Sequence, residues 1–381
     1  MPLTGIGHYT QQIGQGLLSA ECVKDFKLFA HGKFFNQSLL KGKPLSVLSK
    51  DDVVQEPNLF ARTRIRLAFS PFTVKTYQTI FPYIEKWSLR HANDSLFHAP
   101  NFMLPNFEGR KVATIHDLST LRFPQHHPKA RVDFVNHAIN HALEHAVHII
   151  TDSDFIRSEL IDLLGADSSK VTTVHLGADP VFKPRTKDLC ELTLNKYDLN
   201  FEGYFLFVST IEPRKNLHNL LQSFINYRAQ SPHGLPLVIV GGDGWHNDSL
   251  LHTIKELQHK GWVKRLGYVP QADMPVLFSG GKALLFPSTY EGFGLPVLES
   301  MQSGLPVLTS TNSSMSEIID DCGLLVDKDD VEGMTQNIIS LAENTDLLSQ
   351  LSQMGLGKAR SFSWDKCVKD TIGVYKSVIN G

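Results

Sequence analysis

The chain has 381 residues, of which 42% are hydrophobic, and this length allows two domains that each bury a substantial core. Its formal net charge of −2 provides no global positive field, which excludes recruitment of nucleic acid by charge alone. The four cysteines lack metal-site spacing and indicate reduced thiols in a cytosolic protein. A secretory signal and an apolar run of about 18 residues are both absent from the sequence.

Apolar runs alternate with turn signals along the first half of the chain. The pattern predicts strands at 112–115, 148–151 and 171–174 and a helix over 154–164. Such alternation is typical of a parallel sheet with crossover helices, so we expect an α/β fold. The polar, proline-bearing segment 183–187 is the predicted linker to the second half.

The second half repeats this alternation. Strands are predicted at 204–209, 237–240, 283–287 and 306–308, and a helix with one apolar stripe is predicted after Asn216. The sequence therefore predicts a second α/β unit with its own parallel sheet.

One histidine of the first half occupies a position typical of a ligand site. His116 and Asp117 directly follow the predicted strand 112–115. The carboxyl ends of parallel strands form the edge at which open α/β sheets hold ligands. A lone histidine is more often structural, but this position makes His116 the candidate functional residue of the first half. Asp117 is expected either to orient the His116 ring or to cap the next segment.

Two further features of the first half have a functional and a structural interpretation. His137, His141, His145 and His148 recur at helical spacing, which suits a metal, but a solvated histidine-rich face is favoured because no other ligand type follows them closely. The segment 62–87 combines arginines with apolar and aromatic residues. It could dock on anionic lipid, or it could be a basic surface segment whose aromatic residues enter the core.

Adjacent cations mark the first strand-to-helix turn of the second half. Arg214 and Lys215 lie between the predicted strand 204–209 and the helix after Asn216. A helix start is electrostatically unfavourable for cations, which favours function over a solvated basic pair. Arginine supplies a planar fork of donors and lysine a compact charge, and together they suit a diphosphate leaving group.

Two glutamates flank a second predicted helix start, at Pro296. Glu291 lies in the preceding loop, and Glu299 lies about one turn into the helix. Gly292 and Gly294 allow a sharp turn that brings N–H groups close to an anion. Carboxylates beside a phosphate site suit the hydroxyl groups of a ribose and of a sugar. The stretch therefore predicts a sugar-nucleotide site.

A glycine pair follows the predicted strand 237–240. Gly242 and Gly244 form a tight turn around Asp243, without the spacing of the dinucleotide fingerprint, which argues against a dehydrogenase. Each residue alone is equally well explained as part of a simple turn.

Taken in order, these motifs resemble glycosyltransferase family 4, a retaining family with the GT-B architecture of two facing Rossmann-like domains. The resemblance is carried by Gly5-Ile6-Gly7, 114–118, 212–216, 241–244 and 291–299, which span nearly the whole chain. The wording of 5–10 and 212–216 is most similar to the mannosyltransferases that build bacterial O-antigen polysaccharides. This similarity implies GDP-mannose as the donor.

The resemblance also implies domain limits. It places an acceptor-side domain at 1–183, a nucleotide-sugar domain at 184–361 and a helix that crosses back to the first domain at 362–381. The chain departs from the family at one point, because a β-strand precedes the glycine loop in relatives whereas Gly5 follows only four residues here. We therefore expect either that the first strand is missing, which would expose backbone donors and acceptors at a cost of several kcal/mol, or that another element fills the centre of the sheet.

Residue roles follow from the same resemblance. His116, Arg214, Lys215 and Glu291 are the expected catalytic residues. The residues expected to line the nucleotide-sugar site are Gly5, Gly7, Gly242, Gly244, Val269, Gly292, Phe293, Gly294, Leu295 and Glu299. The family needs no metal, and no cofactor is expected apart from the donor substrate.

The expected reaction is transfer of mannose from GDP-mannose, with retention, to a glycan or lipid-linked acceptor in O-antigen synthesis. The alternatives are another donor such as UDP-glucose or UDP-GlcNAc, a sugar-nucleotide epimerase or hydrolase, and an inactive binding module. The expected location is the cytoplasm, with peripheral contact to the inner face of the membrane through 62–87. Nucleic acid is not an expected partner.

Overall fold

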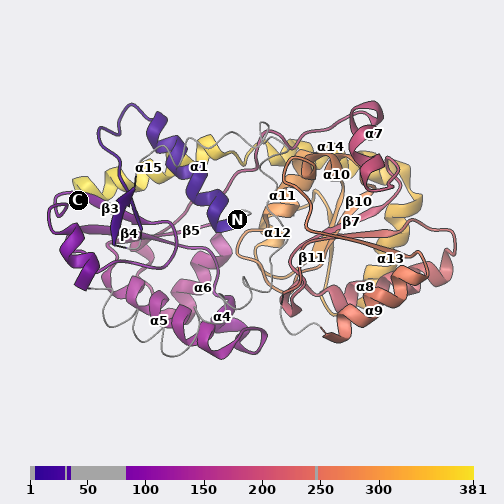
Figure 1. Cartoon of the computed structure of the whole chain (residues 1–381), viewed down its shortest axis with the longest axis horizontal. Coiled ribbons are helices and arrows are strands. Elements are labelled where there is room, and N and C mark those ends of the chain that lie inside the picture. Colours follow the sequence, from indigo (N-terminus) through magenta and orange to yellow (C-terminus); the bar gives the residue numbers. More distant parts are fainter. Residues whose placement is uncertain (1–4, 31, 36–82, 245–247) are drawn as a thin grey trace. The chain divides into compact units, whose positions relative to one another are not determined.

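The computed structural model describes residues 5–30, 32–35, 83–244 and 248–381 (Figure 1). The chain divides into two compact units, one of Met1–Leu176 with Trp364–Gly381 and one of Gly177–Ser363. The first division falls a few residues before the predicted limit at 183. The C-terminal helix is part of the first unit, which is therefore built from two separate stretches of sequence.

The first unit is built on a four-stranded parallel sheet with the strand order β3-β4-β5-β6. These strands are β3 (Leu96–Ala99), β4 (Arg110–Ile115), β5 (His148–Thr151) and β6 (Val171–Thr173). A separate antiparallel pair consists of β1 (Leu28–Ala30) and β2 (Lys33–Phe35). The last four residues of β4 are all buried, as expected for a parallel strand covered on both faces. The three predicted strands are confirmed, whereas β3 was not predicted.

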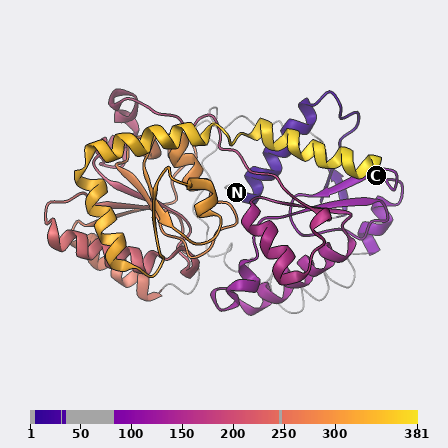
Figure 2. The same cartoon turned by 180° about the vertical axis from the view of Figure 1, so that it is seen from behind.

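Helices cover both faces of this sheet. On one face α1 (Gly5–Ser19) packs along α15 (Trp364–Asn380), and on the other face lie α4 (Ser119–Arg122), α5 (Lys129–His145) and α6 (Asp154–Leu164) (Figures 1 and 2). The bounds of α6 are those predicted from sequence. The Ser153 hydroxyl accepts from the backbone of Ile156 at its start, and Gly165 ends it with a φ of 65°.

The N-terminal glycines lie in a helix, because α1 is the first described element and contains both Gly5 and Gly7. Among the described residues, no strand pairs with the outer edge of β3. A cavity of about 750 Å³ lies beside that edge and is lined by residues of α1, β1, β3 and α15. Residues 1–4, ahead of α1, lie outside the described residues, so the missing first strand stays a prediction.

The second unit contains a six-stranded parallel sheet with the order β12-β11-β10-β7-β8-β9. Its strands are β7 (Phe205–Val208), β8 (Leu237–Val240), β9 (Val263–Gly267), β10 (Ala283–Phe286), β11 (Val307–Ser310) and β12 (Leu324–Val326). The sequence predicted the four strands β7, β8, β10 and β11. It missed β9 and β12, which are the two edge strands and are less completely buried.

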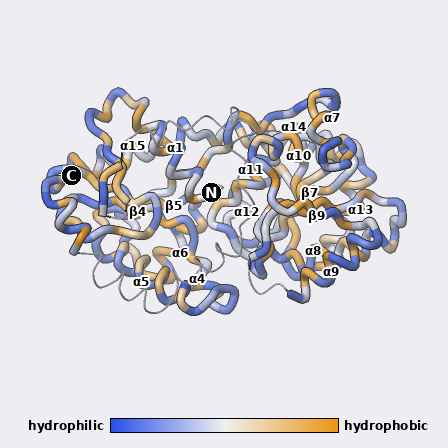
Figure 3. Tube along the Cα trace, in the orientation of Figure 1, coloured by the Kyte–Doolittle hydropathy of each residue, from blue (hydrophilic) through white to orange (hydrophobic). Residues whose placement is uncertain are grey.

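Helices again form two layers around the second sheet (Figure 1). One layer contains α8 (Leu217–Gln230), α9 (Asp248–His259) and α13 (Val331–Glu343). The other contains α7 (Lys187–Lys196), α10 (Met274–Gly280), α11 (Leu295–Gln302) and α14 (Thr345–Ala359), while the short α12 (Met315–Ile319) precedes β12. The apolar stripe of α8 packs on β7 and β8 in one continuous core, and Figure 3 shows the hydrophobic residues gathered on the strands.

Replacing glycine by alanine is expected to have opposite effects on stability at two positions of the second unit. Gly241 has a φ of 136°, and a Cβ there would lie 1.9 Å from the Ser209 carbonyl oxygen. Gly357 lies within α14, where a Cβ would meet nothing within 4 Å. We expect Gly241→Ala to lower the free energy of unfolding by more than about 2 kcal/mol, and Gly357→Ala to raise it by up to about 1 kcal/mol. Urea denaturation of both variants measures this, and equal effects would contradict the backbone geometry.

Candidate functional site

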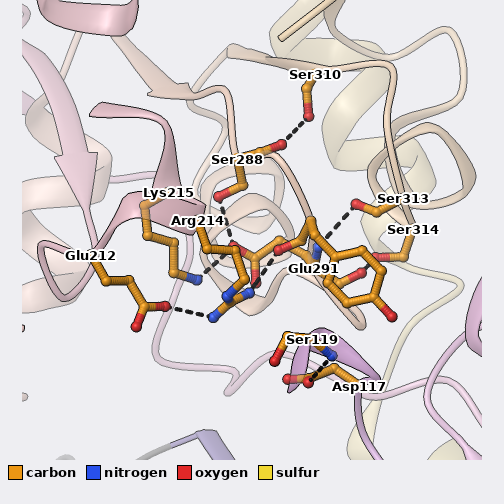
Figure 4. Close-up of polar contacts among 11 residues, drawn as sticks. Asp117, Ser119, Glu212, Arg214, Lys215, Ser288, Glu291, Ser310, Ser313 and Ser314 are labelled. Atoms are coloured by element: carbon orange, nitrogen blue, oxygen red, sulfur yellow. Dashed lines mark hydrogen bonds and ion pairs between the residues drawn. The ribbon is translucent and has the colours of Figure 1, made fainter. Parts of the chain in front are cut away.

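A buried glutamate lies in the loop after β10 in the second unit. Glu291 is only 8% exposed. Its backbone is fixed on both sides by hydroxyl groups, because the N–H donates to Ser313 Oγ at 3.0 Å and the carbonyl accepts from Ser314 Oγ at 2.9 Å. Two serines thereby fix the stretch of loop backbone that carries the carboxylate (Figure 4).

Both predicted cations face this carboxylate (Figure 4). Lys215 Nζ lies 2.5 Å from Glu291 Oε1, and Arg214 Nη1 lies 3.1 Å from Oε2. The Ser288 hydroxyl donates to Oε1 at 2.7 Å. Three donors thus meet at one carboxylate.

The Arg214 guanidinium also bridges to a second acid. Its Nη2 donates to Glu212 Oε1 at 2.8 Å, and Nη1 donates to the Tyr290 carbonyl at 2.6 Å. The fork therefore joins two acidic residues and one backbone carbonyl across two loops. Glu212, Arg214, Lys215 and Glu291 together carry two positive and two negative charges and form what we call the four-charge cluster.

The sheet explains why these residues meet. Strands β7 and β10 are parallel neighbours, so the loops after them leave the same edge. After β7 the chain makes a single 3-10 turn at Pro213–Lys215, and Asn216 then adopts a left-handed conformation with a φ of 55° before α8 begins. This turn places Arg214 and Lys215 ahead of the helix rather than inside it, next to the loop that carries Glu291.

Charge pairing decides the protonation state of the cluster. Burial acts to raise the pKa of Glu291, but Lys215 and Arg214 outweigh it and lower that pKa. Burial and the neighbouring Arg214 lower the pKa of Lys215. Glu291 is therefore a carboxylate at neutral pH, and the two cations are held close together by the acids around them. Such an arrangement is suited to binding a phosphate group, which can replace part of the acidic compensation.

The second predicted glutamate has a different environment. Glu299 lies in α11, which begins after Gly294, a residue with a φ of 97° whose Cβ would meet Met315 Cε at 2.2 Å. Burial, with a smaller contribution from the Asp179 carboxylate, raises the pKa of Glu299 to about 8. Unlike Glu291, Glu299 is therefore largely protonated at neutral pH in this structure.

The remaining predicted donor-site residues of the second unit lie at the ends of strands or in the loop before α11. Gly242 and Gly244 follow β8, and a Cβ on Gly244 would lie 2.5 Å from the Ile211 carbonyl oxygen. Val269 follows β9 and is buried. The other members of this set are Gly292, Phe293, Gly294 and Leu295, which lead into α11.

In the first unit, His116 follows β4 as predicted, and both its ring nitrogens have partners. Nδ1 lies 2.7 Å from Asp152 Oδ2, and Nε2 lies 2.9 Å from the Pro100 carbonyl oxygen. The Pro100 carbonyl can only accept, so Nε2 donates, and Nδ1 donates as well when Asp152 is ionised, which makes the ring an imidazolium. Burial opposes this charge, but Asp152 and Pro100 outweigh it and raise the pKa of His116.

Sequence reasoning missed several partners. Of the two roles expected for Asp117, the structure supports the second, because Asp117 accepts from the backbone N–H of Ser119, the first residue of α4, at 2.9 Å. Asp152 orients the His116 ring instead. Asp152 directly follows β5, so the strand-end rule that selected His116 would also have found it. Glu212 belongs to the motif 212–216, but no residue pattern marks it as a partner of Arg214, and no sequence signal points to Ser288.

The histidine stripe gives no sign of a metal site in the described part of the chain. The rings of His141 and His145 stack at 4.2 Å, and His148 hydrogen-bonds Thr172. These histidines do not belong to any group of three or more ligand atoms within 4.8 Å of one another among the described residues. Most of the segment 62–87 lies outside the described residues. Trp87 is described and is 67% exposed, and no described helix has the length and apolar character needed to cross a bilayer.

Comparison with known proteins identifies the family of this chain. Residues 47–182 match the profile described as Glycosyltransferase Family 4, and residues 196–356 match Glycosyl transferases group 1. The chain is 35% identical to O-antigen chain mannosyltransferase B of Escherichia coli over 375 residues, which cover 98% of this chain and 96% of that protein. The chain belongs to glycosyltransferase family 4. It is therefore a hexosyltransferase.

Solved glycosyltransferase structures share the fold of this family 4 chain. It is similar to WaaG, a glycosyltransferase involved in lipopolysaccharide biosynthesis, with a TM-score of 0.69 and 14% identity over 97% of this chain and 96% of that one. It is also similar to Anabaena HepE in complex with UDP-glucose, with a TM-score of 0.62 and 19% identity over 85% and 84% of the two chains. These likenesses support the predicted GT-B fold.

Proposed function

We propose that this family 4 enzyme transfers mannose from GDP-mannose, with retention, to a glycan or lipid-linked oligosaccharide acceptor in O-antigen synthesis. The observation that carries the proposal is the four-charge cluster at the carboxyl edge of the second sheet, where Arg214 and Lys215 are held together by Glu291. The similarity to an O-antigen mannosyltransferase supports mannose as the sugar.

The proposed mechanism uses the cluster to stabilise the leaving group. As the anomeric bond breaks, negative charge develops on the diphosphate, and Arg214 and Lys215 are placed to compensate it together with the amino end of α11. Glu291 would then accept from hydroxyl groups of the sugar, and Glu299 from those of the ribose. His116 would act toward the donor sugar as a fixed cation rather than as a base, since both its nitrogens already donate.

No residue of the cluster is placed as a covalent nucleophile, so we propose direct attack by the acceptor. The acceptor proton is proposed to pass to the leaving phosphate. Glu291 accepts from three donors and is bound to both cations. A carboxylate held in this way is a weak nucleophile, unlike the paired carboxylates that flank the bond in retaining glycosidases. Same-face attack by the acceptor therefore fits these residues better than a glycosyl-enzyme intermediate.

The test is release of GDP and UDP from a panel of sugar nucleotides, with and without a lipid-linked acceptor presented on vesicles. Acceptor-dependent GDP release from GDP-mannose, lost in Glu291→Ala and Arg214→Ala, would establish mannosyl transfer. Preference for UDP-glucose, the ligand bound to the similar HepE, would change the donor but keep the reaction class. Turnover without acceptor would identify an epimerase or hydrolase, and binding without turnover an inactive module.

The raised pKa of Glu299 predicts a proton-linked affinity for the donor. Accepting from two ribose hydroxyls requires the carboxylate, whereas free Glu299 has a pKa of about 8. Donor binding must then release a proton below that pH, so affinity for GDP-mannose should rise up to about tenfold per pH unit between about pH 6 and 8, and level off above. Isothermal titration calorimetry of donor binding in buffers of different ionisation enthalpy measures the number of protons released. Glu299→Gln should bind more weakly and without this dependence, and a flat wild-type profile would refute the linkage.

A further inference from the structure

The interior of the first unit contains a continuous chain of hydrogen-bonded side chains. Tyr375 Oη lies 2.5 Å from His98 Nδ1, His98 Nε2 lies 2.8 Å from Thr114 Oγ1, and Thr114 Oγ1 lies 2.8 Å from Tyr9 Oη. The four residues come from α15, β3, β4 and α1, respectively. The chain therefore links both helices that cover one face of the sheet through its first two strands.

This chain runs beside His116. Thr114 and His116 are separated by one residue at the end of β4, and His98 and Pro100 are separated by one residue at the end of β3. The His98–Thr114 and Pro100–His116 hydrogen bonds are thus successive links between the same two stretches of backbone. At the far end of the chain, the Tyr9 ring packs edge-on against the His116 ring with a centroid distance of 4.9 Å.

The two histidines differ in charge, because His116 is an imidazolium whereas His98 is neutral. Burial and the nearby charge of His116 lower the pKa of His98 to about 3, so His98 is neutral. A neutral imidazole donates from one nitrogen and accepts at the other. The orientation of the hydrogen bond between Tyr375 and His98 therefore fixes the orientation of the one between His98 and Thr114. Burial raises the pKa of both Tyr375 and Tyr9, which keeps both hydroxyl groups protonated.

The charged and titratable groups around His116 are few in the described residues. Asp152 pairs with it from the end of β5, and Asp117 is its neighbour in sequence. His175 lies near Asp152, and Cys367 of α15 lies near both Asp152 and Tyr9. Burial raises the pKa of Asp152, and His116 is the main group that opposes this rise, since Asp152 Oδ1 is buried without a hydrogen-bond partner among the described residues.

We propose that Tyr375 is a positioning residue for His116 and acts on it from α15 through the hydroxyl–imidazole–hydroxyl chain of His98, Thr114 and Tyr9. Its effect on catalysis rests on the proposed glycosyl transfer, whereas its effect on the His116 ring does not. Removing the Tyr375 hydroxyl leaves His98 Nδ1 without its partner and allows the ring to turn, which releases Thr114 and then Tyr9. The alignment of His116 with Asp152 and Pro100 is expected to loosen.

The first readout is the titration of His116 by NMR of histidine-labelled full-length protein. The alignment raises the pKa of His116, so its loss in Tyr375→Phe should lower that pKa, by about half a unit or more. Ser377→Ala is the matched control, because it removes one hydroxyl from the same helix, and this hydroxyl donates to the Val374 carbonyl of its own helix. An unchanged His116 titration in Tyr375→Phe would overturn the proposal.

The second readout is the pH profile of acceptor-dependent donor turnover. Activity that needs the imidazolium is present below the pKa of His116 and lost above it, so Tyr375→Phe should move the alkaline limb to lower pH and reduce kcat about tenfold, with little change in KM. Thr114→Val should reproduce both effects without altering α15. Thr114→Ser keeps the hydroxyl group and should therefore behave like the wild-type enzyme. An absence of turnover in the wild-type enzyme would refute the proposed function alone, since the NMR titration would still test the positioning role.

Discussion

Replacing Glu291 by alanine is expected to lower the free energy of unfolding of the second unit by about 3–5 kcal/mol and its Tm by roughly 10 °C. The carboxylate is buried between Lys215 and Arg214, and the Arg214 charge already lowers the pKa of Lys215. Its removal leaves two buried cations with Glu212 as the main remaining acid. Thermal denaturation followed by circular dichroism measures the loss.

The anion dependence of this defect separates charge from packing. A diphosphate supplied in solution can replace the missing carboxylate, so pyrophosphate should raise the Tm of Glu291→Ala more than that of the wild-type protein. Glu256→Ala is the control, because Glu256 is an exposed acid of α9 whose one ion pair within the described residues is with His252, and its loss should change stability by less than about 0.5 kcal/mol. A Glu291→Ala protein as stable as the wild type would show that the cluster does not hold buried charge.

Replacing Arg214 by lysine is expected to reduce acceptor-dependent GDP release by about 100-fold or more while keeping the fold. Lysine retains the positive charge but lacks the planar fork that joins Glu212, the Tyr290 carbonyl and Glu291. The two loops would lose their shared anchor, and the charge would no longer be fixed where the leaving group develops its own.

Steady-state kinetics with GDP-mannose and a lipid-linked acceptor test this expectation. The loss should fall on kcat, because the interaction is strongest in the transition state. Arg228→Lys is the matched control, since Arg228 lies at the end of α8, donates to the Pro232 carbonyl and packs over Trp262 away from the cluster. Wild-type turnover by Arg214→Lys would mean that a point charge suffices and that the fork has no catalytic role.

The buried central strands could be predicted because their residues are continuously apolar, as in Leu237–Val240. The edge strand Val263–Gly267 carries Lys264 and Arg265, and such a mixed pattern does not distinguish a strand from a loop. The helix Asp154–Leu164 was predicted with its bounds from the turn signals on either side, and the structure shows that a serine cap and a left-handed glycine form its ends.

The candidate site was predictable in its residues but not in its contacts. Strand ends identified His116, Arg214, Lys215 and Glu291, because the edge of a parallel sheet gathers loops that are distant in sequence. The pairing of Glu291 with both cations depends on the order β10-β7 within the sheet, and the choice of Asp152 over Asp117 depends on side-chain direction. Neither can be obtained from residue types and spacing.

The split composition of the first unit has a consequence for biosynthesis. The helix α15 supplies Tyr375 and Cys367 to its interior, yet about half the chain, including the entire second unit, separates α15 from β6. At typical translation rates of about 5–20 residues per second, the ribosome needs roughly 10–40 s to make the intervening stretch. During that time α15 is missing, so the surfaces of α1 and of the sheet that α15 covers in the folded unit remain exposed. The unit that is synthesised first is therefore completed last. Nascent chains of this enzyme should therefore depend on chaperones until their final helix emerges.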